Sequence, residues 1–305
     1  MGIDQIVFVL LIVFALAAVF ASCLKHAIIT SGVFGLWASL AYLLHHAPDV
    51  AISEAVVASS LGTVLLILTI RNYGDIKVPG IPRMIWQRKG ADLVMLGTTA
   101  LVLFLTVSTP QVEIGPVRDA VMGNFLDSSG VVNPVTSVLL HYRVFDTVLE
   151  ALMLLVAVLG VMHLSDAKIG GPAAAGYGSL SARHPTMVKA LQILTPVLII
   201  VGVALIVGDP ITPGGGFQGA GLLAAVIVSR YLAGARGPAG TKNLETLEKV
   251  IFVVFVLSVG LYVFLGLREY GPDVYAPFMI AMNGLLGLKV FCGLSIMFLY
   301  FTREA

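Results

Sequence analysis

The fold of this chain is decided by residues 133–164, which read NPVTSVLLHYRVFDTVLEALMLLVAVLGVMHL. The second half of the stretch is an unbroken apolar run, and about 20 such residues are enough for a helix to cross a membrane. The first half carries Arg143, Asp146 and Glu150, whose spacings of three and four place them along one stripe of a helix. The stretch predicts a membrane-spanning helix that starts with a charged stripe.

Charged side chains at membrane depth are costly, by roughly 2.5–3.5 kcal/mol each on insertion scales, and they pair, face the protein interior or line an ion path. Asp146 and Glu150 lie four residues apart, so in a poor dielectric one of them is expected to hold a proton or to face a cation. Arg143 is the nearest counter-charge. Two interpretations stay open: a carboxylate site in a proton or cation route, or three groups that satisfy one another at an interfacial helix end.

Composition extends the membrane prediction to the whole chain. The 305 residues are 58% hydrophobic and 11% charged, with a mean hydropathy of +0.98, which is too little polar surface for a soluble domain of this length. The apolar runs are continuous rather than alternating, so we expect an all-α polytopic transmembrane helical bundle and not a barrel. About nine spans are expected, at residues 3–22, 26–44, 49–70, 91–107, a helix ending near 164, 187–207, 217–232, 247–267 and 277–301.

The basic residues predict an orientation. With nine spans, most of the 18 Lys and Arg residues fall on one side of the membrane, and such a bias marks the cytoplasmic side. We therefore expect the amino terminus outside and the carboxyl terminus in the cytoplasm. The first apolar run has no basic segment before it, so a retained helix is expected rather than a signal peptide. The outer loop at 108–132 is expected to be a solvated cap.

Several classes of function are not supported. A formal charge of +1 gives no case for nucleic-acid binding. The two cysteines, Cys23 and Cys292, lie in unrelated segments without CxxC spacing, so neither a metal cluster nor a disulfide framework is indicated. No catalytic residue, metal site or cofactor is expected, and any redox chemistry would belong to partner chains.

Two connections divide the chain into blocks. Residues 71–90 are basic and contain prolines, and residues 165–185 are rich in Gly, Ala and Ser, both typical of linkers. We expect both connections to be cytoplasmic. They separate blocks of three, two and four expected helices at residues 1–70, 91–164 and 186–305.

The third expected span carries a carboxylate in the stretch PDVAISEAVV. Glu54 lies about one and a half turns from the outer face, roughly 7–8 Å deep. It is either a helix-start carboxylate that reaches water and the favourable dipole end or a protonatable site. Asp49 is expected to cap the helix after Pro48. The neighbouring His45 and His46 are expected at the interface, with proton relay as the alternative.

Lys289 lies near the middle of the last expected span, in NGLLGLKVFCGL. A lysine at mid-span cannot easily extend to the membrane surface, so we expect a buried partner or a water-filled cavity beside it. Its alternative role is a structural ion pair that joins helices. Asp92, at the start of the fourth span, is expected to be a cap.

The outer turn at residues 209–221 reads DPITPGGGFQGAG. Its glycines allow the positive φ of a sharp turn, and the small residues Gly215, Gly219 and Ala220 offer a face for close helix packing. No GK[ST] follows, so a phosphate loop is not expected. The alternative to packing is a cation site made of freed carbonyls, with Asp209 nearby. The predicted structural turn consists of Pro213, Gly214, Gly215 and Gly216.

These segments together resemble the small subunits of Mrp-type (MnhB/MrpB-related) multisubunit Na+/H+ antiporters and the matching subunits of membrane-bound hydrogenases. APDVAISEAVV resembles the three-helix block that continues the large antiporter subunit. YRVFDTVLEALMLLVAVLG resembles the following block, with Arg, Phe-Asp-Thr and Glu at the family's spacing. PGGGFQG and NGLLGLKVFCGL resemble the MnhB/MrpB-type subunit. One departure is that these commonly separate pieces are fused here.

The resemblance implies an accessory, ion-translocating part of a larger assembly in a prokaryotic cell membrane. It implies Na+ and H+ as the ions, and other antiporter subunits or hydrogenase-like redox subunits as partners. The alternative is a structural subunit that bridges antiporter and redox modules without carrying ions. An intramembrane enzyme is not expected, since no nucleophile–base set appears. The residues that would carry, gate or tune ions are Glu54, Asp146, Glu150, Lys289 and Arg143.

Overall fold

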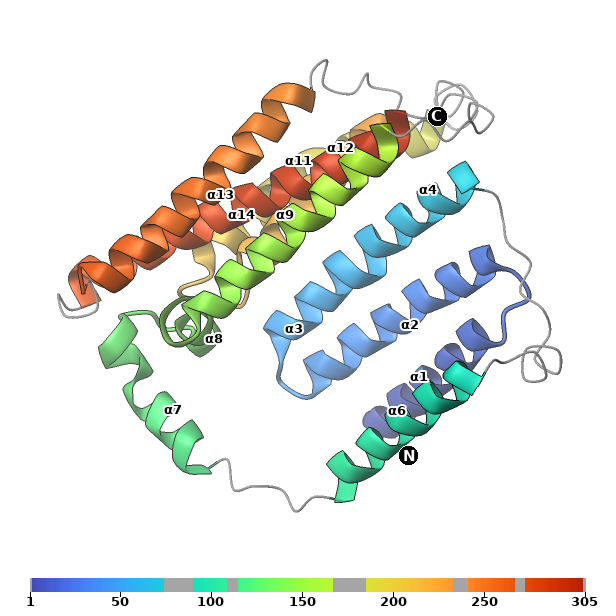
Figure 1. Cartoon of the computed structure of the whole chain (residues 1–305), viewed down its shortest axis with the longest axis horizontal. Coiled ribbons are helices and arrows are strands. Elements are labelled where there is room, and N and C mark those ends of the chain that lie inside the picture. Colours follow the sequence, from blue (N-terminus) through green and yellow to red (C-terminus); the bar gives the residue numbers. More distant parts are fainter. Residues whose placement is uncertain are drawn as a thin grey trace.

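The structure, a computed structural model, describes residues 2–73, 90–108, 115–166, 185–232, 241–266 and 272–303. Over these residues it consists of helices and their turns, with no strand (Figure 1). The all-α prediction is confirmed. The helices are α1 (Ile3–Val19), α2 (Leu24–Leu44), α3 (Pro48–Ser53), α4 (Thr63–Tyr73), α6 (Gly90–Ser108), α7 (Gly115–Ser129), α8 (Pro134–Ser137), α9 (Val144–Asp166), α11 (Pro185–Gly208), α12 (Gly216–Leu232), α13 (Thr241–Phe264) and α14 (Pro272–Arg303).

Six helical stretches within the described residues are long and apolar enough to cross a membrane. Helices also occur at the other expected positions, but α1 and α12 have only 17 residues each, fewer than the ~20 that a span needs. The expected count of nine spans is therefore not confirmed. The six stretches are Leu24–Leu44, Pro48–Ile70, Val144–Leu164, Val188–Gly208, Lys242–Phe264 and Asp273–Thr302.

Two π-helical segments interrupt the regular helices. The segment η1 (Glu54–Gly62) joins α3 to α4, so that the third expected span is one continuous rod, and η2 (Val138–Tyr142) follows α8. Within η1 the hydroxyls of Ser59 and Ser60 donate to carbonyls five residues earlier, at 2.8 and 2.7 Å. A π-helical turn leaves its carbonyls more widely spaced than an α-turn does, and such turns occur frequently at functional sites.

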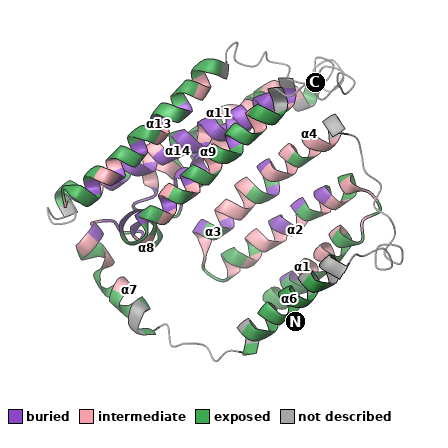
Figure 2. Cartoon of the chain, in the orientation of Figure 1, coloured by how far each residue is buried: buried purple, intermediate pink, exposed green. Residues whose placement is uncertain are grey.

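Helix α14 is the centre of the core. Of the residues in its most apolar stretch, 61% are buried, against 6–28% in the other five candidate spans. Its side chains Tyr275, Met279 and Met282 are at most 1% exposed. It packs against α9, α12 and α13. Figure 2 shows the buried residues gathered on α14 and its neighbours, while α6 and α7 are largely exposed. This central position makes α14 the frame on which polar side chains can be buried.

The amino-terminal helices form a second layer beside this core. Helix α2 packs closely on η1, because Gly32 and Gly35 have no side chain to hold the two apart. A Cβ on Gly32 would lie 2.6 Å from Thr63 Oγ1, and one on Gly35 would lie 3.0 Å from Glu54 Oε1. The layer then meets the core where η1 contacts α12.

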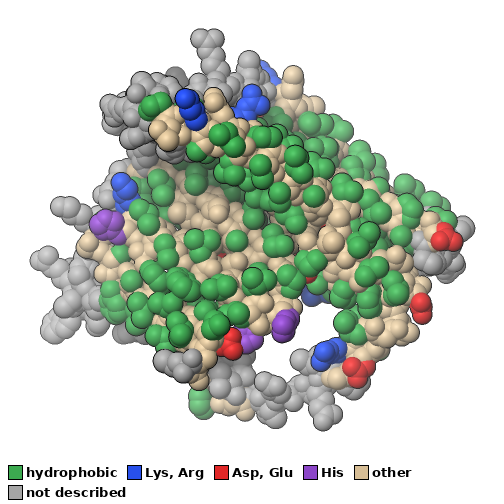
Figure 3. All heavy atoms as spheres, turned by 180° about the vertical axis from the view of Figure 1, so that it is seen from behind, with side chains coloured by type: hydrophobic (Ala, Val, Ile, Leu, Met, Phe, Trp, Pro, Cys, Tyr) green, Lys and Arg blue, Asp and Glu red, His purple; other side chains and the backbone are tan. Residues whose placement is uncertain are grey.

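The outer surface is dominated by apolar side chains. Figure 3 shows hydrophobic side chains spread over most of the described face, with the few charged groups near its edges. Exposed apolar surface of this extent marks sites that contact a membrane or another protein. Between residues 108 and 132, where a solvated cap is expected, the structure has the helix α7, and whether α7 acts as a cap stays a prediction.

Candidate functional site

The glycine turn between α11 and α12 contacts parts of the chain that are distant in the sequence. Gly214 N donates to Asp49 Oδ1 at 2.9 Å, and Gly216 N donates to Asn283 Oδ1 at 2.9 Å. Gly215 adopts φ +140°, a conformation that side chains rarely allow. Main-chain N–H groups of the turn are therefore bonded to side chains of helices α3 and α14.

The expectation that Asp49 caps its helix is wrong. The N-cap position of α3 is Ala47, which makes no side-chain cap bond, and Asp49 lies in the first turn. Its carboxylate, 8% exposed, accepts from Gly214 instead. Gln218 Nε2 donates to Ser53 Oγ at 2.8 Å one turn further along α3. Side chains of α3 thus fix the turn rather than the end of their own helix.

The segment before η2 fixes the same turn from another side. Asn133 Nδ2 and Thr136 Oγ1 both donate to the carbonyl of Asp209 at 3.0 Å, and the main-chain N–H groups of Val132 and Asn133 donate to Pro210 O. Two carbonyls of the turn that a cation site could use, those of Asp209 and Pro210, therefore already accept hydrogen bonds. Together with the tight approach of Gly219 to Ile206, this favours the packing interpretation of the turn.

A cavity lies against this turn, inside the bundle. Its volume of about 30 Å³ exceeds the ~10–15 Å³ that one water molecule needs. No group of three or more His, Cys, Asp or Glu side chains among the described residues is arranged to hold a metal ion. Most of the accessible lining is apolar, and a smaller part of it comes from groups that can bind water. The polar side chains in it belong to Thr136, Thr147, Glu150, Asp209, Gln218 and Asn283.

Asp209 is the acidic group of the turn and is 5% exposed. Burial raises the pKa of its carboxyl from 3.8 to about 6, and the nearby Asp49 carboxylate adds to the rise. A role for Asp209 in a cation site stays a prediction. A carboxyl with this pKa can take up and release a proton near neutral pH.

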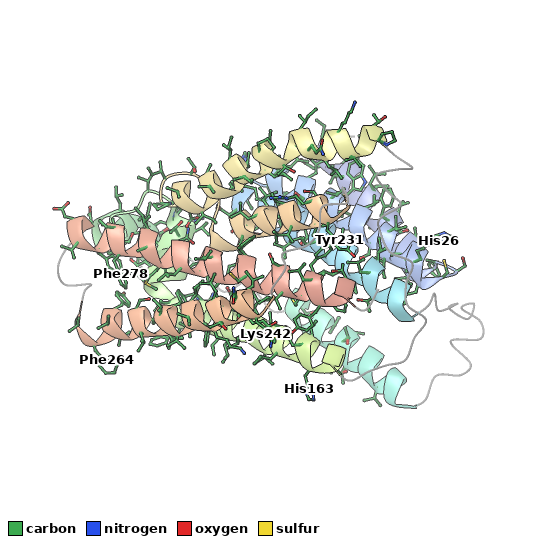
Figure 4. The ribbon with its side chains drawn as sticks, turned by 90° about the horizontal axis from the view of Figure 1, so that it is seen from above. His26, His163, Tyr231, Lys242, Phe264 and Phe278 are labelled. Carbon is green, nitrogen blue, oxygen red and sulfur yellow. The ribbon has the colours of Figure 1, made fainter. Side chains whose placement is uncertain are left out.

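A second polar centre lies deeper, on α14. Lys289 Nζ donates to Ala151 O of α9 at 2.6 Å and lies 3.4 Å from Glu248 Oε1 of α13. The two side chains are 0% and 1% exposed, and the Phe252 ring lies 5.8 Å from the ammonium. The expected buried partner of Lys289 is thus confirmed. Figure 4 shows α13, between Lys242 and Phe264, running alongside α14.

The charged stripe of Arg143, Asp146 and Glu150 is divided in the structure. Arg143 ends η2 outside α9, so the prediction that all three share one helical stripe is wrong. Arg143 forms an ion pair with Asp146 in which the side chains are 67% and 44% exposed. Glu150 alone lines the cavity. The chain bends at Arg143 because the wide turn of η2 ends there.

The other predicted residues lie away from the cavity. Glu54 begins η1, half-buried, and its carboxylate packs on Gly35 of α2. His45 and His46 are exposed at the end of α2, where His46 has φ +58°. The His45 ring lies 5.7 Å from that of Phe8. Their roles in ion movement stay predictions.

Two buried polar residues were missed from the sequence. Glu248 lies just inside the expected span at 247–267, where a carboxylate was a visible signal. His141, in η2, is 3% exposed, with its Nδ1 3.4 Å from the Tyr262 hydroxyl and its ring 5.0 Å from that of Tyr275. Its signal was its place in the polar half of the stretch that decides the fold.

Comparison with known families now bears on both halves of the chain. Residues 9–75 match the MbhD family, which is described as a subunit of MBH. Residues 186–300 match the family described as a domain related to the MnhB subunit of Na+/H+ antiporter. Residues 9–75, which match MbhD, are called the MbhD segment below, and residues 186–300 are called the MnhB-related segment. The resemblance to fused small subunits of Mrp-type antiporters is confirmed.

Relatives carry the same likeness. The chain is 26% identical over 173 residues to a Na(+)/H(+) antiporter subunit of Bacillus subtilis, an alignment that covers 55% of this chain and 21% of the relative. It is 29% identical over 194 residues to an uncharacterized protein of Methanocaldococcus jannaschii, covering 53% and 74% of the two chains. The chain thus spans about a fifth of the length of the antiporter subunit that it matches.

Solved structures share the fold. A chain of the Mrp complex from a Dietzia species matches with a TM-score of 0.77 at 22% identity, covering 99% of this chain and 35% of that one. A chain of the membrane-bound sulfane sulfur reductase, an archaeal respiratory membrane complex, matches with a TM-score of 0.51 at 20% identity, covering 68% and 96%. The arrangement of helices is therefore one that also occurs in chains of these two complexes.

The two polar centres are shared unequally between the segments. The MbhD segment contributes Asp49 and Ser53, which accept hydrogen bonds from Gly214 and Gln218 at the glycine turn between α11 and α12. The MnhB-related segment contributes the turn itself and the Glu248–Lys289 pair. Glu150, which lines the cavity, belongs to neither segment, because it lies between residues 75 and 186 in the sequence.

Proposed function

We propose that this membrane subunit belongs to a multisubunit Na+/H+ antiporter module and contributes buried acidic and basic side chains to its ion route. The likeness to antiporter subunits supports the module, and the two polar centres support the route. Its partners would be other antiporter subunits in a prokaryotic cell membrane. Redox subunits like those of membrane-bound hydrogenases would be further partners where the parent complex has them.

The observation that carries the proposal is the adjacency of the cavity and the buried ion pair. Glu150 lines the cavity, and the next residue, Ala151, offers the carbonyl to which Lys289 donates. On α14 the cavity reaches Leu286, which is one helical turn from Lys289. The two centres therefore meet on both α9 and α14.

This arrangement suits proton transfer. Water in the cavity can exchange protons with Glu150 and Asp209, both of which line it. A charge as deeply buried as that of Lys289 is strongly sensitive to the charge state of its neighbours. In this proposal a proton placed on Glu150 would act on the ammonium of Lys289, which is bonded to the main chain of the next residue, Ala151. The Glu248–Lys289 pair would respond by releasing a proton from the Lys289 ammonium.

The other predicted carriers have secondary places in this proposal. Glu54, half-buried on the MbhD segment, would serve a separate part of the route. Asp146, with Arg143, would tune the electrostatic potential outside the cavity. His45 and His46 would exchange protons at the membrane surface.

Sodium-driven proton exchange in liposomes that hold the purified parent complex tests the proposal. Glu150→Gln is expected to lower the initial rate by at least roughly 100-fold, the usual worth of a positioned proton-transfer group. Asp4→Asn is the control, since it removes an exposed carboxylate in the first turn of α1 that does not line the cavity, and its rate should stay within about threefold. A normal rate for Glu150→Gln in an intact complex would refute the proposed route.

A further inference from the structure

We propose that Glu245 and Tyr300 form the mouth through which protons reach the Glu248–Lys289 pair from the side opposite the cavity. This inference rests on the proposed function. The cavity touches α14 at Asn283 and Leu286, whereas Tyr300 lies near the other end of the same helix. The pair at Lys289 thus lies between a cavity on one side and this contact on the other.

The contact itself is specific. The Tyr300 hydroxyl donates to Glu245 Oε1 at 2.9 Å, joining the last turns of α14 to the first turns of α13. Tyr300 is 8% exposed and Glu245 is half-buried. Glu245 is therefore a carboxylate that both reaches water and accepts a hydrogen bond from inside the bundle.

Helix geometry aligns this contact with the ion pair. Glu245 and Glu248 are three residues apart on α13, so their Cβ atoms are about 5–6 Å apart on one face. Lys289 and Tyr300 are eleven residues apart on α14, close to three full turns, so they also share a face. The two faces are the ones that α13 and α14 turn toward each other, as the Glu248–Lys289 and Glu245–Tyr300 contacts show.

Burial makes such a neighbour necessary. Glu248 is 1% exposed, so it has no direct exchange with bulk water. Lys242 and Lys249, the cations on this end of α13, are exposed and hold the local potential positive. Glu245 is the acidic group one turn toward the water from Glu248, and its partner Tyr300 holds it in place.

The transfer conserves protons and charge. A proton from water binds the Glu245 carboxylate, which then passes it to the Glu248 carboxylate and returns to its ionised form. Neutral Glu248 leaves the Lys289 ammonium buried without a counter-charge, which is unfavourable. Lys289 then releases one proton toward the cavity beside Glu150. One proton has been taken up at the mouth and one delivered to the cavity.

Three variants of the parent complex, reconstituted in liposomes, test this mouth by the initial rate of sodium-driven proton exchange. Glu245→Gln keeps the shape of the side chain and is expected to lower the rate by at least roughly tenfold. Tyr300→Phe removes only the hydroxyl and should lower it about fivefold. Thr246→Val, a neighbouring exposed position, is the control and should match the wild type.

The outcomes separate the two proposals when Glu248→Gln is measured in parallel. A wild-type rate for Glu245→Gln alongside a lost rate for Glu248→Gln overturns the mouth and leaves the proposed function standing. Wild-type rates for both variants overturn both proposals. If Glu245→Gln prevents assembly, Tyr300→Phe decides, because an assembled Tyr300→Phe complex with an unchanged rate also overturns the mouth. A slower rate whose pH profile shifts relative to the wild type is the supporting result.

Discussion

Asp49 and Gly214 lie 165 positions apart in the chain and are joined by one hydrogen bond, in which Gly214 N donates to Asp49 Oδ1 at 2.9 Å. The bond links the MbhD segment to the MnhB-related segment. Both groups are buried, so neither can find water as a substitute if the other is removed. Together with the hydrogen bond from Gln218 to Ser53 and the packing of α12 on η1, this contact helps to hold as one unit two segments that match separate families.

Asp49→Ala is expected to loosen this union. The substitution leaves the Gly214 N–H buried without an acceptor, which costs about 1–3 kcal/mol. The melting temperature of the purified complex should fall. Asp49→Asn retains an acceptor oxygen at the same position, so its melting temperature should fall less. Equal melting temperatures for Asp49→Ala and the wild type would show that the contact does not stabilise the fold.

Gly219→Ala tests the close packing of α12 on α11. A Cβ at Gly219 would lie 2.5 Å from Ile206 Cγ1 and would also meet the carbonyl of Gly202, so the helices must separate. We expect a loss of roughly 1–3 kcal/mol in stability. Gly160→Ala is the matched control, because a Cβ there meets nothing within 4 Å, and alanine favours a helix by up to about 1 kcal/mol. A Gly219→Ala complex as stable as the Gly160→Ala complex would contradict this packing.

Asp209 should make stability depend on pH. Its pKa is raised to about 6 in the folded chain from an ordinary value of 3.8, so the folded state holds this proton where the unfolded state releases it. Stability from this group is therefore present at low pH and is lost as the pH rises from about 4 to about 6. Asp209→Asn should melt higher than the wild type at pH 8, with a difference that shrinks toward pH 4. A difference that does not change with pH would contradict this origin.

The sequence was sufficient for the class of fold and for the positions of the long apolar helices, but not for α7, which lies in an expected loop. Apolar runs of span length located the helices, because burial in lipid requires continuous apolar faces. It also predicted a buried partner for Lys289, since an isolated ammonium at mid-span is too costly. Which residue supplies the partner was not predictable, because Glu248 comes from another helix and the choice depends on how α13 and α14 pack.

The π-helical segments caused the main local error. A regular helix through Arg143 would have kept it on the stripe of Asp146 and Glu150, but η2 ends at Arg143 and breaks the periodicity. Asp49 was misassigned for a different reason, because its position directly after Pro48 is typical of residues at the start of a helix. Its true partner, Gly214, is set by tertiary packing. Local patterns cannot show a contact between residues so far apart.

The most direct test of ion carriage replaces the buried pair with apolar side chains of similar volume, Glu248→Met and Lys289→Met together. Such replacements are often neutral or stabilising, because no charge remains to be desolvated, so the complex should assemble and melt close to the wild-type temperature. Sodium-driven proton exchange by this double variant in liposomes should be lost. A wild-type rate of exchange would show that the pair only joins helices and that this protein is a scaffold.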